Sequence, residues 1–178
     1  GLNHFMCQNM SSFVDSDVAA TGAINLTAGY VKGTTSLTVD GFSAAITNNS
    51  WIKVGGDNTP LRVVSTTGGS TPTVIVVASP GIRAAVANDA VVTVYGGAAV
   101  NNSGGYAAGY SKYITVDTFT KSPRVGQMVT FGTSSSSAIY TIVDVDSSSI
   151  MLDRPLEASI ADDAAVNLAP GGNYNFAF

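Results

Sequence analysis

The sequence predicts an all-β protein made of two tandem small antiparallel units, each a β-barrel or sandwich. Short β-branched segments alternate with Gly, Ser, Asn and Asp turns, and no long stretch has the 3.6-residue hydrophobic period of a helix. The chain also repeats itself: LTVDGF at 37–42 recurs as ITVDTF at 114–119, and WIKV at 51–54 recurs as MVTF at 128–131, both 77 positions later. VANDA at 86–90 recurs as IADDA at 160–164. An internal repeat of this kind indicates one structural unit used twice.

The elements follow from this repeat. Residues 1–35 are expected to form a leading extended segment and a connector with a candidate short strand at 23–26, and residues 97–111 a Gly- and Tyr-rich linker. The first repeat, 36–96, has expected strands at 36–39, 51–54, 61–66, 73–78 and 91–95. The second repeat, 112–170, has expected strands at 113–116, 128–131, 139–145, 149–152 and 165–168. Residues 171–178 then read as a returning strand.

The alternation of side chains along the strands predicts which residues face inward. We expect three matched inward pairs, Leu37 with Ile114, Trp51 with Met128, and Ile75 with Met151. We also expect the extended segments 2–8 and 173–178 to lie side by side, because the chain reads as a fragment of a longer protein, inserted in a parent domain.

The composition excludes several function classes. Of the 178 residues, 45% are hydrophobic, which is enough for a core, whereas 11% are charged, less than half the usual share. The net charge is −4 and the basic residues are scattered singly, which argues against specific nucleic-acid binding. The apolar runs are strand-sized, which argues against a membrane helix. The single cysteine, Cys7, excludes an internal disulfide.

The residue inventory offers little for catalysis or for a cofactor. His4 is the only histidine and stands in no catalytic motif, and Cys7 has no local signature of a nucleophile. Asp144 and Asp146 share one strand face, which suits either a calcium site or, more simply, a solvated face. Tyr106, Tyr110 and Tyr113 suit a sugar-stacking surface or, more simply, loop anchors. We therefore expect no enzyme, no cofactor and no metal.

A resemblance extends over the whole chain and is sharpest in its second half. GQMVTFG at 126–132, IYTIV at 139–143, IMLDRPL at 150–156 and ADDAAV at 161–166 resemble the insertion domain of short-tailed-phage (Lederbergvirus-type) major coat proteins. LNHFM at 2–6 and NYNFAF at 173–178 look like the strands that leave and rejoin the parent fold. The first repeat departs from the family pattern at Asn49 and Ser50, where a Gly-Asp turn is expected. The barrel is also duplicated.

The resemblance implies a fold and a role. The parent would be the tailed-phage capsid fold, and the inserted barrels would aid folding of the coat subunit and make contacts within and between capsomers. The expected location is the virion capsid, assembled in the host cytoplasm, and the expected partners are other coat subunits, with a decoration protein as a further candidate. Asp57, Lys121 and Arg124 are the candidate intersubunit contacts. The alternative is a carbohydrate- or receptor-binding β module of a phage tail or decoration protein.

Overall fold

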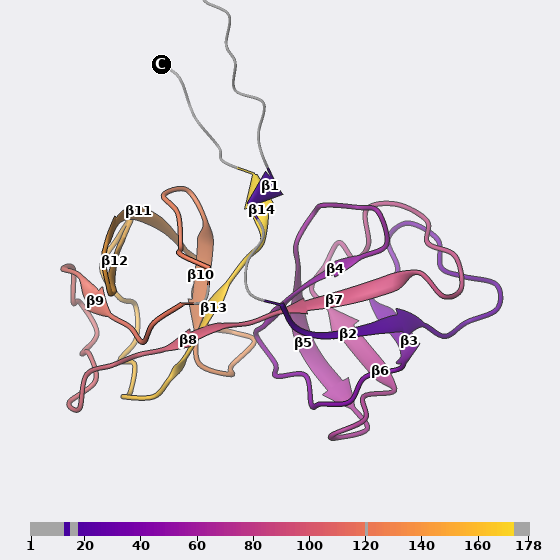
Figure 1. Cartoon of the computed structure of the whole chain (residues 1–178), viewed down its shortest axis with the longest axis horizontal. Coiled ribbons are helices and arrows are strands. Elements are labelled where there is room, and N and C mark those ends of the chain that lie inside the picture. The colour runs from indigo at the N-terminus through magenta and orange to yellow at the C-terminus, as the bar shows by residue number, and fades with distance from the viewer. Residues whose placement is uncertain (1–12, 15–17, 120, 173–178) are drawn as a thin grey trace, which may run out of the picture.

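The structure is a computed structural model that describes residues 13–14, 18–119 and 121–172, and every regular element in them is a β-strand. Two β units lie side by side, and a short ribbon of β1 and β14 stands next to their junction (Figure 1). The strands are β1 (Phe13–Val14), β2 (Val18–Ile24), β3 (Ser36–Asp40), β4 (Trp51–Val54), β5 (Leu61–Thr67), β6 (Val74–Val77), β7 (Val91–Tyr95), β8 (Gly97–Ala99), β9 (Ile114–Thr115), β10 (Met128–Phe131), β11 (Tyr140–Asp146), β12 (Ser149–Leu152), β13 (Ala165–Leu168) and β14 (Gly171–Gly172).

The first unit is a closed antiparallel barrel with the strand order β2-β3-β6-β5-β4-β7. It closes because β2 is hydrogen-bonded to both β3 and β7, so no strand edge is left open. Alternate side chains of each strand point inward, and the core is built from residues such as Leu37, Ile52, Val63 and Ile75. Burying a side chain of this size is worth about 1.5–3 kcal/mol before the conformational entropy of folding is counted.

The second unit is a six-stranded sheet in the order β8-β13-β10-β11-β12-β9. Its two edge strands approach each other through a bridge between Val100 and Val116. The Asn101 amide donates to the carbonyl of Thr115 (3.0 Å) and the Asp117 amide to that of Ala99 (2.9 Å). Val100, Ile114, Val129, Ile142 and Ile150 are among its fully buried core residues.

The two units share one topology, which confirms the predicted pair of similar antiparallel units. In chain order, β2 to β7 of the barrel correspond to β8 to β13 of the second unit. Corresponding strands have corresponding neighbours in the two units, except that the second sheet is not closed between β8 and β9. A β-bulge interrupts both long hairpins at the same place, between Val63 and Ser65 in one and between Ile142 and Asp144 in the other. Left-handed backbone recurs in step as well, since Asp89 (φ 62°) is matched by Asp163 (φ 58°).

The repeat begins earlier than the sequence indicates. β2 and β8 each supply a strand to their unit, although they fall in the expected connector 1–35 and the expected linker 97–111. The Tyr30 hydroxyl accepts a hydrogen bond from the Thr38 amide (2.7 Å), and the Tyr106 hydroxyl accepts one from the Thr115 amide (2.8 Å). The Gly-Ala-Ala sequence of β8 lacks the β-branched residues that mark a strand, which is why it reads as a linker.

Two of the three predicted inward pairs need correction. Leu37 and Ile114 are fully buried in their cores, as predicted. Ile75 pairs with Leu37 whereas Ile150 pairs with Ile114, so the buried counterpart of Ile75 is Ile150 and not Met151.

Trp51 is buried but does not belong to the barrel core, because its strand neighbours Ile52 and Val54 point inward. Met128 likewise lies on the outward face, since Val129 and Phe131 are the core residues of β10.

The chain enters and leaves the two units at one point. β1 pairs antiparallel with β14, with Phe13 opposite Gly172 and Val14 opposite Gly171 (Figure 1). Segments 2–8 and 173–178, for which adjacency was predicted, lie outside the described residues, as do His4 and Cys7.

Candidate functional site

The most developed polar site in the described residues is the junction between the two units. Asn49 is fully buried and has left-handed backbone (φ 72°), a conformation that Asn tolerates better than most residues. Its Nδ2 donates to the carbonyls of Phe131 (3.1 Å) and Gly132 (3.0 Å) at the end of β10. The Thr130 hydroxyl donates back to the Asn49 carbonyl (3.1 Å). One side chain of the first unit is thereby fixed to the backbone of the second.

Arg62 on β5 extends this junction. Its Nε donates to Asn49 Oδ1 (2.7 Å), and its Nη2 donates to the carbonyls of Ser137 (2.7 Å) and Ser134 (3.3 Å). Partial burial lowers the pKa of the Arg62 guanidinium, which nevertheless stays protonated, as arginine does in proteins. The guanidinium orients the Asn49 amide and fixes the loop after β10.

Trp51 adds apolar area beside this polar contact. It follows Asn49 by two positions, lies opposite Arg62 and Tyr95 in the sheet, and is 3% exposed although it faces away from the barrel core. Its indole Nε1 is buried and has no hydrogen-bond partner among the residues that the structure describes. Trp51 and its neighbour Tyr95, which is 2% exposed, are therefore both buried outside the barrel core.

The junction uses different surfaces of the two repeats. The start of β4 in the first unit meets the end of β10 in the second. In the second unit Gly126 and Thr141 stand at the positions of Asn49 and Arg62, because Met128 pairs with Thr141 as Trp51 pairs with Arg62. Neither residue can reproduce the two side chains. The contact is thus heterologous and specific to one order of the repeats.

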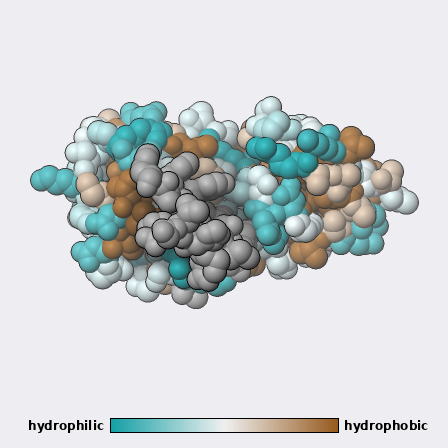
Figure 2. Space-filling view, turned by 90° about the horizontal axis from the view of Figure 1, so that it is seen from above, coloured by the Kyte–Doolittle hydropathy of each residue, from teal (hydrophilic) through white to brown (hydrophobic). Residues whose placement is uncertain are grey.

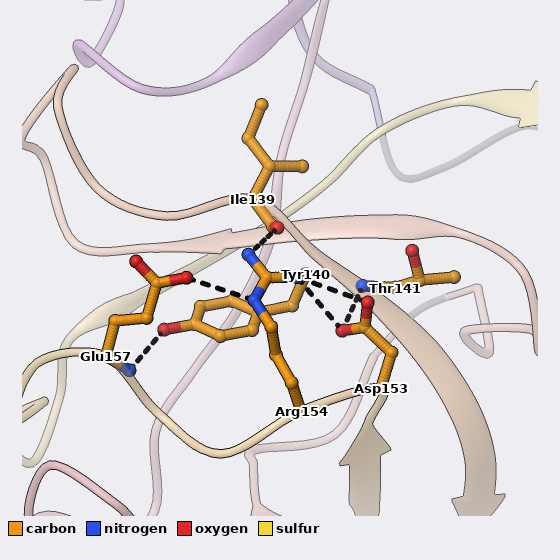
Figure 3. A network of polar contacts seen from close by, with 6 residues as sticks. All are labelled: Ile139, Tyr140, Thr141, Asp153, Arg154 and Glu157. Atoms are coloured by element: carbon orange, nitrogen blue, oxygen red, sulfur yellow. Dashed lines mark hydrogen bonds and ion pairs between the residues drawn. The ribbon is translucent and has the colours of Figure 1, made fainter.

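A second cluster of polar contacts surrounds Arg154, after β12 (Figure 3). The guanidinium lies over the Tyr140 ring, 4.6 Å from its centre, and its Nη2 donates to the Ile139 carbonyl (2.6 Å). Nε pairs with Glu157 (3.0 Å) and Nη1 with Asp153 (3.1 Å). The hydrogen bond to Glu157 is the main cause of the raised pKa of Arg154. Because these groups are partly exposed, each ion pair is worth no more than about 1 kcal/mol. Together the contacts hold the 153–157 loop against Tyr140.

A hollow of about 590 Å³ opens beside this cluster. Tyr140 and Phe131 lie at its base, but each is only 4% exposed, so neither ring offers a face for stacking. The residues that line it include Glu157 and the hydroxyl-bearing Thr133, Ser134, Ser136, Ser137 and Ser159. Such a lining can form hydrogen bonds to a polar partner but carries no nucleophile–base pair.

The acidic and aromatic candidates have structural roles. Tyr106 is buried against Tyr110, with ring centres 4.6 Å apart, so it anchors a loop as the simpler interpretation predicted. The Tyr113 hydroxyl donates a hydrogen bond to Asp144, which lowers the pKa of Asp144 and raises that of Tyr113. Asp144 and Asp146 are both exposed. Within the described residues, no group of three or more His, Cys, Asp and Glu side chains gathers as a metal site would require.

The three candidate intersubunit residues lie on two loops, one in each unit. Asp57, half-buried after β4, accepts a hydrogen bond from the Thr59 amide (2.9 Å). Arg124 has an exposed side chain before β10, and its amide donates to Gln127 Oε1 (2.7 Å). Lys121 is exposed on the same segment as Arg124. Sequence reasoning missed Asn49, Arg62 and Arg154; the one signal for Asn49 was its departure from the expected Gly-Asp turn.

No protein-family model and no curated protein matches this chain. The described residues also contain no helix that is long and apolar enough to cross a membrane.

Proposed function

We propose that this chain is the inserted β region of a phage major coat protein, a structural part of the virion that braces its subunit and contacts neighbouring subunits. The observation that carries the proposal is the β1–β14 ribbon, through which the chain enters and leaves two β units at one point. Insertion in a host domain requires such a geometry, because the host chain continues from neighbouring positions. The sequence resemblance to coat-protein insertion domains points the same way.

The chemistry of the described residues also supports a structural role. Two of the buried or half-buried polar side chains, Asn49 and Arg62, hold the two units together. Each unit alone has about 75 residues, a size at which a single core gives marginal stability. A joined pair presents a more rigid body to neighbouring subunits than either unit alone would.

Stoichiometry in purified virions tests the proposal. Trypsin should release residues 63–83, between Arg62 and Arg83, as one peptide suited to quantitative mass spectrometry. A coat protein predicts a copy number equal to that of the most abundant virion protein. A copy number many times lower would refute the coat assignment.

The second candidate is a carbohydrate- or receptor-binding module of a tail or decoration protein. The hydroxyl-lined hollow beside Glu157 favours it, because such a lining can form hydrogen bonds to a sugar. A glycan array separates the candidates: saturable binding that is lost in Glu157→Gln supports the module, whereas the coat assignment predicts no glycan signal.

A further inference from the structure

The two units differ in charge although they share a topology. The first barrel, residues 18–96, carries four basic and three acidic side chains, whereas residues 97–172 carry four basic and seven acidic ones. The corresponding net charges are +1 and −3. Unlike charges at the two ends of one molecule favour association in which the first unit of one copy meets the second unit of another.

Two of the four basic side chains of the first barrel line one hollow. Lys32 and Arg83 both line a hollow of about 590 Å³, together with Thr59, Pro80 and Ile82. Both side chains are exposed, and within the described residues neither has an ion-pair or hydrogen-bond partner. Val31, next to Lys32, is 73% exposed, the largest value among the exposed large hydrophobic residues. We call this surface the basic hollow.

The second unit carries a surface of complementary character on β11. Asp144 and Asp146 are exposed two positions apart, which separates neighbouring side chains on a strand by about 7 Å. The β-bulge after Ile142 lies beside Val143, which is 44% exposed, and Tyr113, 37% exposed, donates its hydroxyl hydrogen to Asp144. That hydrogen bond lowers the pKa of Asp144, whose carboxyl is ionised at neutral pH with or without it. We call this surface the acidic strand.

Charge sets the orientation of such a contact. On the face shown in Figure 2, hydrophobic and hydrophilic side chains are interspersed over both units. β11 and β12 lie at one end of the long axis, and the loop that follows β2, which holds Lys32, lies toward the other (Figure 1). A contact between these ends is therefore head-to-tail and heterologous.

We propose that the basic hollow of one copy receives the acidic strand of a second copy of this chain. Lys32 and Arg83 would pair with Asp144 and Asp146 of the neighbour, and the exposed Val31 and Val143 would meet beside them. The proposal rests on the proposed function in one respect, because neighbouring coat subunits are copies of one another. It concerns self-association of this chain, so its test is independent of the virion experiment.

The test is sedimentation velocity over a concentration series at low and high salt. Variant one carries Lys32→Glu and Arg83→Glu, and variant two carries Asp144→Lys and Asp146→Lys. The wild-type chain should associate weakly at low salt and dissociate as salt is raised. Each variant alone should associate about two- to thirtyfold more weakly than wild type, which is the range expected for two exposed ion pairs.

An equimolar mixture of the two variants should recover association, since each supplies the intact surface that the other lacks. The control carries Asp40→Lys and Asp117→Lys, the same change of charge at exposed sites outside both surfaces, and should associate no more weakly than wild type. The proposal is overturned if the wild-type chain stays monomeric at millimolar concentration and low salt. It is also overturned if either variant associates as tightly as wild type, or if the mixture does not associate. Circular dichroism of each variant establishes that a loss of association does not come from unfolding.

Discussion

The junction between the units gives the sharpest prediction, because one residue supplies most of it. Asn49→Gly removes two hydrogen bonds to backbone carbonyls and one from the Arg62 guanidinium. At about 1 kcal/mol for each neutral bond and about 1.5–3 kcal/mol for the charged one, the loss is about 3–5 kcal/mol. Asn49→Ala loses the same bonds and keeps a Cβ in the left-handed region, so it should be about 1–2 kcal/mol less stable than the glycine variant. Alanine should therefore be worse than glycine here, the reverse of their usual order.

Urea denaturation measures this effect. Trp51 is the only tryptophan and lies two positions from Asn49, so its fluorescence reports on the junction, while circular dichroism reports on both units. The wild type should unfold with both signals together, and Asn49→Gly should separate them because the units no longer unfold as one. The matched control is Asp89→Gly, at another left-handed position (φ 62°) outside the junction, with an expected change below about 1 kcal/mol. The reasoning fails if Asn49→Gly costs less than about 1 kcal/mol, or if the glycine and alanine variants are equally stable.

Four further predictions follow from single residues. Trp51→Ala should lower the free energy of unfolding by about 3–5 kcal/mol, because it removes a buried aromatic side chain. Trp51→Phe should cost about half as much, because no hydrogen bond of the indole N–H is lost. Urea midpoints followed by circular dichroism check both values. Gly97→Ala should disrupt the pairing of β8 with β13, because the added Cβ would lie 1.7 Å from a backbone oxygen of β13. Faster hydrogen exchange of the β13 amides would show this disruption, and unchanged protection would contradict the prediction. Tyr113→Phe should raise the pKa of Asp144 toward its ordinary value, as followed by carboxyl NMR, and an unchanged titration would contradict the role of the hydroxyl. The lowered pKa of Asp144 stabilises the fold at pH values above the ordinary carboxyl pKa, and this contribution is lost as the pH falls through the folded-state pKa. Arg124→Glu in a whole coat protein should reduce assembly while subunit stability is retained; unchanged assembly would identify a solvated charge, and loss of both would indicate a role in folding.

The strands with strong β patterns could be predicted from the sequence, and several have the predicted bounds, for example Trp51–Val54 and Met128–Phe131. β8 could not, because the pairing of Gly-Ala-Ala with β13 comes from the closure of the sheet rather than from local preference. The match of Ile75 to Met151 was off by one position, since in an uninterrupted apolar run such as Ile150–Leu152 the pattern does not tell which side chain faces inward.

The junction was beyond sequence analysis for a different physical reason. A strand residue that is buried outside the core of its own barrel has the same local pattern as one that faces that core, so Trp51 was predicted to be a core residue. Asn49 looked like an ordinary turn residue, and its importance depends on carbonyl groups more than 80 positions away. Only the arrangement of the two units reveals that these oxygens lie within its reach.

The divergence of the two repeats at the junction explains why a heterologous contact between similar units stops after one step. Suppose that the second unit also carried Asn and Arg at the positions of Asn49 and Arg62. It could then bind the end of β4 in another copy, in the way that the first unit binds the end of β10. Successive copies would then join without limit. Gly126 keeps the left-handed backbone at that position (φ 91°) but has no amide to donate, and Thr141 is too short to reproduce the guanidinium. The fold of the repeat is thus retained while its capacity to propagate this contact is lost. Any association between copies must then use other surfaces, such as the basic hollow and the acidic strand, where the two repeats differ in charge rather than in backbone.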